Sequence, residues 1–258
     1  MRLAEKVIVV TGSTTGVGEG IARRCMAEGA KVVVHGLERD LGEKVVRELG
    51  AGAALWCNDL TRAESAGELI RFAVSTFGRI DGLVNNAASV ARGNLETTTV
   101  EFFDSIIALN LRAPLLLIQA ALPYLRRSWG AVLNIGSVNA YCGEPNLLPY
   151  SISKGGLMTL TRNVADALGR DQVRVNQINI GWTLTPNEHR LKIEEGLPAD
   201  WAQRPPRDVC PSGRLLMPED VGAMAVYWLS DESRLISGTV MDFAQHPIIG
   251  RNPPKRME

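Results

Sequence analysis

Short apolar runs alternate with amphipathic segments along most of the chain. The apolar runs predict strands over residues 7–10, 31–35, 53–57, 80–85, 131–136, 173–180 and 239–243. Apolar residues recur at helical spacing from Ile21 to Met26 and across 39–49, 62–77, 100–127, 151–168 and 218–229. Strands that are apolar on both faces are typical of parallel sheets covered by helices on both sides. The pattern therefore predicts an α/β fold with a single doubly wound parallel sheet, Rossmann-like in organisation.

One segment, residues 181–214, interrupts the alternation. It contains Pro186, Pro198, Pro205, Pro206 and Pro211, and it follows a strand end, where open α/β sheets bind ligands. We expect a substrate-covering loop with short helices, although a plain surface excursion fits the same composition. The 258 residues are then predicted to form one dinucleotide-binding and catalytic domain with an extended tail at about 244–258.

Composition narrows the possible partners. The chain has 28 Lys and Arg against 28 Asp and Glu, so its formal charge is zero, which disfavours nucleic-acid binding. Its longest apolar stretch is shorter than the roughly 20 residues that a bilayer requires, and its start does not resemble a signal peptide. We therefore expect no membrane association and a cytoplasmic location. The four cysteines form no CxxC pair and the three histidines lack ligand spacing, so we expect no metal.

Two local patterns indicate chemistry. Residues 11–18 place three glycines between the first strand and the first helix, where a backbone can approach a pyrophosphate and helix N–H groups can bind it. Tyr150 and Lys154 are four residues apart and share one helix face. An ammonium beside a phenol lowers a pKa that is ordinarily about 10, which makes the phenol a usable acid or base.

Together these motifs resemble the short-chain dehydrogenase/reductase family. Thr11, Gly12, Gly16 and Gly18 match its TGxxxGxG loop, Asn85-Asn86-Ala87 matches its NNAG segment with Ala88 in place of glycine, and Ser137 precedes Tyr150 by 13 positions. The match extends from Lys6 to about Gly238. The resemblance implies hydride transfer between a nicotinamide cofactor and a secondary alcohol or ketone. Tyr150 would exchange the proton, Ser137 would polarise the substrate oxygen, Lys154 would bond the ribose and tune Tyr150, and Asn110 would position a water.

The resemblance also implies a set of cofactor contacts. These are Gly12, Thr14, Thr15, Gly16, Val17, Gly18, Gly36, Leu37, Asp59, Leu60, Asn86, Ala87, Tyr150, Lys154, Gly181, Thr183 and Thr185. Gly36 occupies the position of the acid that commonly marks NAD enzymes, and Leu37 and Thr15 occupy the basic positions of NADP enzymes. Because Glu38 stands beside Arg39 and would repel a 2′-phosphate, we expect NAD in preference to NADP.

The substrate is predicted from neighbours of the catalytic residues. The candidates are Ser137, Asn139, Glu144, Trp182 and His189, with Tyr141, Asn187 and Glu188 close by in sequence. So many hydrogen-bonding groups favour a hydroxyl-rich substrate such as a sugar, sugar acid or polyol. A reductase of 3-oxoacyl or other apolar carbonyl substrates, and a non-catalytic dinucleotide sensor, remain alternatives. The resemblance further implies a homotetramer, with the tail on a neighbouring subunit and Gln245 or His246 near its pocket.

Overall fold

The computed structural model describes residues 1–246 and has one parallel sheet of seven strands in this part of the chain. The strands are β1 (Val7–Val10), β2 (Lys31–Gly36), β3 (Ala53–Cys57), β4 (Gly82–Asn85), β5 (Ala131–Ser137), β6 (Arg174–Ile180) and β7 (Val240–Phe243). Their order across the sheet is β3-β2-β1-β4-β5-β6-β7. The order reverses between β1 and β4, and such a switch point opens a crevice at the carboxyl ends of the strands. The predicted fold class is confirmed.

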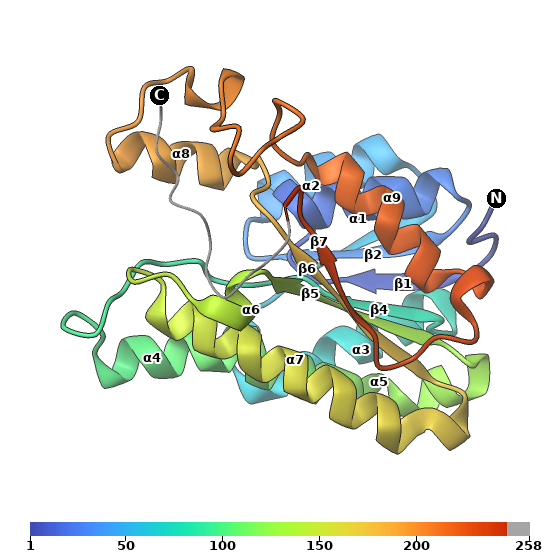
Figure 1. The fold of residues 1–258 in the computed structure, drawn as a ribbon. Coiled ribbons are helices and arrows are strands. Elements are labelled where there is room, and N and C mark those ends of the chain that lie inside the picture. The colour runs from blue at the N-terminus through green and yellow to red at the C-terminus, as the bar shows by residue number, and fades with distance from the viewer. Residues whose placement is uncertain (247–258) are drawn as a thin grey trace.

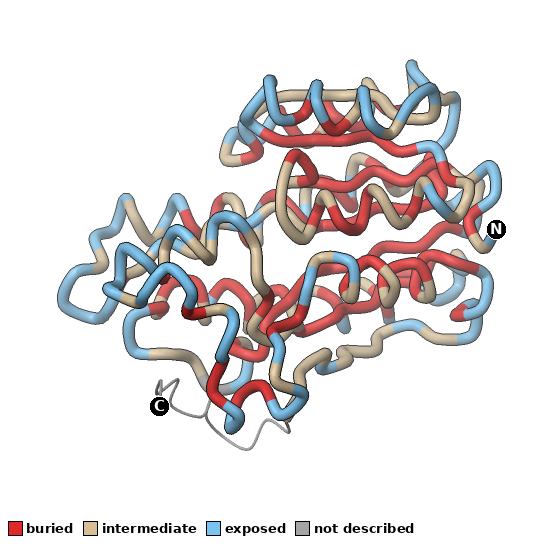
Figure 2. Tube along the Cα trace, turned by 90° about the horizontal axis from the view of Figure 1, so that it is seen from above, coloured by how far each residue is buried: buried red, intermediate tan, exposed pale blue. Residues whose placement is uncertain are grey.

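Helices cover both faces of the sheet (Figure 1). One face carries α1 (Gly16–Ala27), α2 (Arg39–Leu49) and α9 (Pro218–Leu229), and the other carries α3 (Ala63–Phe77), α5 (Ala113–Ser128) and α7 (Leu148–Leu168). Successive side chains of β1 alternate between the two cores: Ile8 and Val10 pack with α1 and α9, whereas Val9 packs with α3 and α5. Figure 2 shows the buried residues concentrated along the strands between these layers.

The long helical stretch predicted over 100–127 is divided into three parts. Helix α4 (Val100–Ile107) is followed by a π-helical turn (Ala108–Arg112) and then by α5. By length and apolar composition this stretch could cross a membrane, yet Leu117 and Ile118 are buried in the core against the sheet. A π turn inserts an extra residue into the helix and often occurs at functional sites. Here it carries Asn110.

The segment after β6 contains more regular structure than a loop. Helix α8 (Pro186–Glu194) is followed by a 3₁₀ turn (Trp201–Gln203). Trp201, Val209, Cys210 and Leu215 form a small core of their own. Figure 1 places α8 beyond the end of the sheet, above the carboxyl end of β6. The remaining short elements are α6 (Asn139–Cys142) and 3₁₀ turns at Gly169–Asp171 and Asp231–Ser233.

Candidate active site

A cleft of about 650 Å³ opens at the carboxyl ends of the strands. It brings together twenty of the residues predicted from the sequence. These are Gly12, Thr14, Thr15, Gly16, Val17, Gly36, Leu37, Asp59, Leu60, Asn86, Ala87, Ser137, Asn139, Glu144, Tyr150, Lys154, Gly181, Trp182, Thr183 and Thr185. Three predicted site residues, Gly18, Asn110 and His189, are not among those that line it.

The glycine loop has a backbone that side chains would disrupt. Gly12 and Gly16 have φ values of +61° and +59°, in the left-handed region that favours glycine. A Cβ at Gly18 would lie 2.1 Å from the Gly12 carbonyl oxygen, and one at Gly12 would lie 2.8 Å from Ala87 Cα. Gly18 therefore packs beneath the loop and acts on the cleft through the loop's shape.

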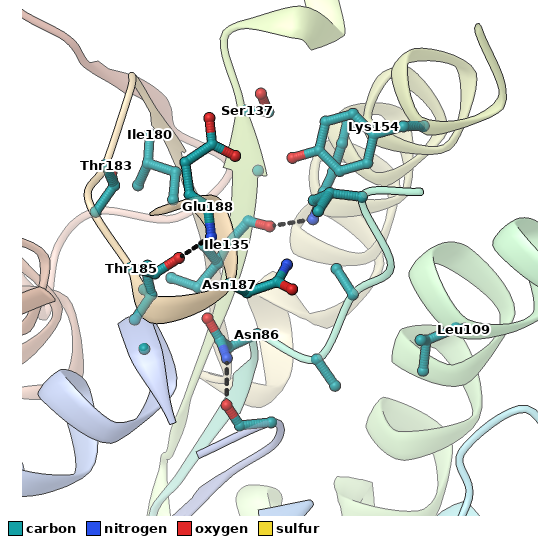
Figure 3. Close-up of a pocket in the computed structure, with 18 of the residues that line it drawn as sticks. Asn86, Leu109, Ile135, Ser137, Lys154, Ile180, Thr183, Thr185, Asn187 and Glu188 are labelled. Carbon is teal, nitrogen blue, oxygen red and sulfur yellow. Dashed lines mark hydrogen bonds between the residues drawn. The ribbon is translucent and has the colours of Figure 1, made fainter. Parts of the chain in front are cut away.

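Side chains from β4 and β1 brace the same loop. Asn86 Nδ2 donates to the carbonyl oxygens of Thr11 at 2.9 Å and Gly12 at 3.0 Å (Figure 3). Thr11 Oγ1 in turn accepts from the backbone N–H groups of Asn86 and Ala87, each at 3.0 Å. Thr15 precedes α1 without a side-chain capping bond, which leaves N–H groups of the first turn available to a ligand. This cradle fits the pyrophosphate of a dinucleotide.

The end of β2 supplies the next part of the cleft wall. A Cβ at Gly36 would meet Thr14 Oγ1 at 2.5 Å, so glycine keeps this corner open. Glu38 lines the cleft and accepts a hydrogen bond from Thr14 Oγ1 at 3.3 Å. Arg39 instead lies 3.9 Å from Glu43, on its own helix, and is absent from the cleft wall. The charged side chain that lines this corner is thus the Glu38 carboxylate, and the preference for NAD stays a prediction.

His35 and Asn58 also line this region, and neither was predicted as a site residue. His35 Nδ1 is 3.4 Å from the Gly12 backbone nitrogen, and Nε2 is 3.0 Å from Asn58 Oδ1. Burial lowers the pKa of His35, so the neutral ring accepts from Gly12 and donates to Asn58. His35 therefore ties the glycine loop to the end of β3.

Three predicted catalytic residues meet at the centre of the cleft. Ser137 ends β5, and Tyr150 and Lys154 lie one turn apart on α7. The Lys154 ammonium lies 5.6 Å from the centre of the Tyr150 ring, and it donates to the Ile135 carbonyl oxygen at 2.7 Å (Figure 3). Tyr150 and Ser137 both line the cleft here. The arrangement places a phenol, a hydroxyl and an ammonium around one point.

Burial is the main cause of the pKa shifts of Tyr150 and Lys154. It raises the pKa of Tyr150 to about 12, with the Ser137 hydrogen bond acting in the opposite direction, and it lowers the pKa of Lys154 to about 8. The sequence led us to expect a lowered tyrosine pKa. That expectation is not met, because desolvation of the phenolate outweighs the favourable interactions around it.

Asn110 lies behind the cleft in the π-helical turn. Its Oδ1 accepts from the Ser89 N–H at 2.9 Å, and its Nδ2 donates to Ser89 O at 3.0 Å and Ser153 Oγ at 3.1 Å. Ser153 Oγ donates to the Tyr150 carbonyl oxygen at 2.6 Å. Asn110 thus joins the segment after β4 to α7, and its role in holding a water stays a prediction.

The substrate end of the cleft is built from charged and aromatic side chains. Trp182 Nε1 donates to Glu188 Oε1 at 2.7 Å, and Arg92 Nη2 lies 3.8 Å from Glu188 Oε2. Arg92 Nε also donates to Glu195 Oε1 at 2.8 Å, and Lys192 Nζ contacts Glu195 Oε2 at 2.5 Å. Arg92 follows β4 and matches no motif, so sequence reasoning missed it.

Two candidate substrate residues lie elsewhere. His189 faces the small core of the 181–214 segment, with its ring 6.0 Å from that of Trp201 and Nε2 3.1 Å from Ala199 O. The helical turn directs it away from Glu188, its neighbour in sequence. Tyr141 is 44% exposed and interacts with Asp242 and Asn179, away from the cleft.

The Thr185 hydroxyl lines the cleft and also caps α8, accepting from the Glu188 N–H at 3.1 Å.

Residues after β7 close the substrate end within the same chain. Gln245 accepts from the Ser212 N–H at 3.1 Å and donates to Arg214 O at 2.7 Å. His246 Nδ1 lies 3.2 Å from Val209 O, and His246 lines this chain's own cleft. The two residues thus hold the chain's own 209–214 segment, and their predicted place near a neighbouring subunit's pocket stays a prediction. The rest of the predicted tail, 247–258, lies outside the described residues.

Within residues 1–246, no group of three or more His, Cys, Asp or Glu side chains is placed to hold a metal ion.

Comparison with known proteins is consistent with this geometry. Residues 12–243 match the family model described as enoyl-(acyl carrier protein) reductase. L-fucose dehydrogenase of Oryctolagus cuniculus is 37% identical over 90% of this chain and 81% of that protein. D-beta-hydroxybutyrate dehydrogenase of Cupriavidus necator is 31% identical over 91% and 95%. The NADH complex of 3-ketoacyl-(acyl-carrier-protein) reductase from Brucella melitensis has a TM-score of 0.83 and 29% identity over 93% and 97%.

The chain belongs to the short-chain dehydrogenase/reductase family. Its activity is that of a nicotinamide-dependent oxidoreductase acting on the CH–OH group of a small molecule. The family resemblance inferred from the glycine loop and from Tyr150 and Lys154 is therefore confirmed, while the cofactor preference and the substrate are left to the proposal below.

Proposed function

We propose that the protein is an NAD-dependent dehydrogenase of neutral, hydroxyl-bearing substrates such as aldoses or polyols. One observation carries this proposal: Tyr150 and Ser137 share their cleft with the polar wall formed by Trp182, Glu188 and Arg92. Buried polar groups penalise ligands that leave them without partners, so this wall favours a substrate with several hydroxyls. Similarity to L-fucose dehydrogenase supports the same class.

Each predicted catalytic residue has its own role in the reaction. When bound, the nicotinamide supplies the hydride acceptor for oxidation or the hydride donor for reduction. In reduction Tyr150 donates its proton to the carbonyl oxygen. In oxidation Tyr150, whose pKa burial raises to about 12, must first lose its own proton before its phenolate takes the proton of the substrate hydroxyl. Ser137 donates a hydrogen bond to the same oxygen, and Lys154 bonds the ribose. Asn110 keeps α7 in register with the segment after β4 through Ser89 and Ser153.

The NAD preference rests on the corner at the end of β2. Glu38 lines the cleft there and accepts a hydrogen bond from Thr14, while Arg39 pairs with Glu43. Among residues 1–246, no basic side chain lines the cleft beside Glu38, so a 2′-phosphate would meet an unopposed carboxylate, whereas a 2′-hydroxyl can donate to that carboxylate.

A substrate screen tests the proposal. Initial rates would be followed by reduced-cofactor absorbance with NAD and NADP, using L-fucose, D-arabinose, xylitol, D-3-hydroxybutyrate and cyclohexanol, and ketones in the reverse direction. We expect the highest kcat/KM with NAD and an aldose or polyol. Turnover confined to acyl or apolar carbonyl substrates would overturn the proposal. It would favour a carbonyl reductase, the class to which the similar acyl-carrier-protein reductases belong. Cofactor binding without turnover of any substrate would favour a dinucleotide sensor.

We also propose that the protein is a cytoplasmic homotetramer. Light scattering after size exclusion measures the assembly directly, and removal of residues 251–258 asks whether the tail stabilises it. A monomer at micromolar concentration would contradict the tetramer, and unchanged assembly after the deletion would exclude a role for those residues. Fractionation of the native host would locate the protein.

A further inference from the structure

The polar wall opposite Tyr150 is electrically balanced. Arg92 and Lys192 provide two positive charges, and Glu188 and Glu195 provide two negative charges, all within one network that links the segment after β4 to α8. Glu144 adds a further carboxylate to the cleft lining. The substrate end therefore has no surplus positive charge with which to offset the desolvation of a substrate carboxylate.

Glu188 is the carboxylate of this network that faces the reacting centre. It lines the cleft, and Figure 3 shows its carboxylate directed toward the part of the cleft where Ser137 lies. Trp182 fixes one oxygen at 2.7 Å, and the N–H at the start of α8 is held by Thr185. The second oxygen is 3.8 Å from Arg92, beyond hydrogen-bond distance. Glu195 belongs to the same network but does not line the cleft.

We propose that Glu188 is a specificity-determining residue that accepts a hydrogen bond from a substrate hydroxyl next to the reacting carbon. The carboxylate is oriented before substrate arrives, because Trp182 and the capped start of α8 hold it in place. A hydroxyl on the carbon next to the reacting one can donate a hydrogen bond to the second carboxylate oxygen of Glu188. A substrate carboxylate in the same place would meet like charge, so the site selects neutral polyhydroxylated compounds and disfavours hydroxy acids and sugar acids.

This inference rests on the proposed function and deepens it, because it names the residue that selects the substrate class. It also refines the sequence-based prediction, which placed sugar acids together with sugars and polyols. The electrostatic field of the network acts on the same centre, since Glu188 raises the pKa of Tyr150 and Arg92 lowers it.

The test compares Glu188→Gln with Glu194→Gln, which removes the same charge from the exposed side of α8, outside both the cleft and the network. Wild type and both variants would be assayed with the aldose or polyol that wild type turns over fastest, and NADH affinity would be measured by fluorescence titration. We expect Glu188→Gln to lose about tenfold or more in kcat/KM, as for a charge-assisted hydrogen bond, with NADH affinity within about twofold of wild type. Glu194→Gln, whose partner Arg190 is exposed, should stay within about threefold of wild type on both measures.

Two alcohols that differ by one hydroxyl distinguish a loss of hydroxyl recognition by Glu188 from a general loss of activity. Wild type should prefer trans-1,2-cyclohexanediol to cyclohexanol, and Glu188→Gln should lose most of that preference, whereas Glu188→Asp, which keeps the charge, should recover part of it. Equal effects of the two Gln variants on aldose turnover, or a faster reaction of wild type with D-3-hydroxybutyrate than with any aldose, would overturn the inference. If wild type reacts only with apolar carbonyls, the proposed function fails together with the inference. If wild type oxidises aldoses or polyols but the two Gln variants behave alike, only the inference about Glu188 fails.

Discussion

The two halves of the cleft are built in different ways. The cofactor half, around β1, β2 and β4, is shaped mainly by backbone: Gly12 and Gly16 adopt positive φ values, and Gly18 packs against a carbonyl oxygen. The substrate half, around α8, is shaped by side chains, with Arg92, Trp182 and Glu188 held by ion pairs and hydrogen bonds. The first half tolerates almost no change in residue volume, and the second can change its chemistry without changing the fold.

This difference predicts how each half responds to substitution. A change in the glycine loop should remove cofactor binding and with it every activity. A change on the α8 wall should alter which substrate is used and leave cofactor binding intact.

Gly18→Ala should abolish cofactor binding. The new Cβ would lie 2.1 Å from the Gly12 carbonyl oxygen, so the loop must move, at a cost of about 1–3 kcal/mol in folding free energy or more. The matched control is Gly169→Ala at the end of α7, where no atom lies within 4 Å of the new Cβ and φ is negative, at −55°. NADH titration and thermal unfolding should show a loss in the first variant and no loss in the second. Normal NADH affinity in Gly18→Ala would contradict the account of the loop.

Ketone reduction should depend on the protonation of Lys154. Burial lowers the pKa of Lys154 to about 8 and raises the pKa of Tyr150 to about 12, so Tyr150 keeps its proton through the neutral range while Lys154 loses its charge above pH 8. The kcat/KM for reduction should therefore be level below pH 8 and fall about tenfold per pH unit above it. Lys154→Arg should remove this fall, whatever its residual activity, because arginine stays charged. A wild-type profile that is level to pH 10 would contradict the assignment.

Glu38→Gln should weaken the preference for NAD. The carboxylate lines the corner beside Gly36 but is exposed to solvent, so water and salt screen its repulsion of a 2′-phosphate. The ratio of kcat/KM for NAD to that for NADP should fall by about three- to tenfold. Glu48→Gln, which lies on α2 outside the cleft and removes a carboxylate paired with Arg23 and not with Arg39, serves as the control. An unchanged ratio in Glu38→Gln would mean that other residues set the preference.

Gln245→Ala should have the smallest effect. It removes the hydrogen bonds to Ser212 and Arg214 that hold the 209–214 segment, and these are exposed. Each such bond contributes about 0.5–1.5 kcal/mol, so we expect a rise of a few-fold in the substrate KM with NADH affinity unchanged. A larger change in NADH affinity than in KM would show that the two halves of the cleft are not independent.

The same difference between the halves explains what could be predicted from the sequence. The glycine loop and the alternating strands could be predicted because local steric demands fix both the residue type and the spacing, as at Gly12 and Gly18. Arg92 could not, because it matches no motif and reaches the cleft from the segment after β4. His246 was expected near a neighbouring subunit's pocket, whereas it lines the cleft of its own chain. The orientation of His189 was not predictable either, since neighbouring residues on a short helix face different environments.

The protonation state of Tyr150 could not be deduced from the spacing. Its position four residues before Lys154 indicates that the two share a helix face, but not how deeply both are buried. Burial is set by the packing of α7 against β5 and by the segment after β4. In the folded chain the desolvation of the phenol decides the direction of the pKa shift.

The most direct test of the account is Tyr150→Phe, measured for NADH affinity and for turnover on the same sample. The substitution removes one hydroxyl from the centre of the cleft and leaves the glycine loop and the α8 wall unchanged. We predict that NADH affinity stays within about twofold of wild type and that kcat falls by about a hundredfold or more, the loss expected when a general acid–base group is removed. Turnover near the wild-type rate in this variant would contradict the assignment of Tyr150 and with it the central claim.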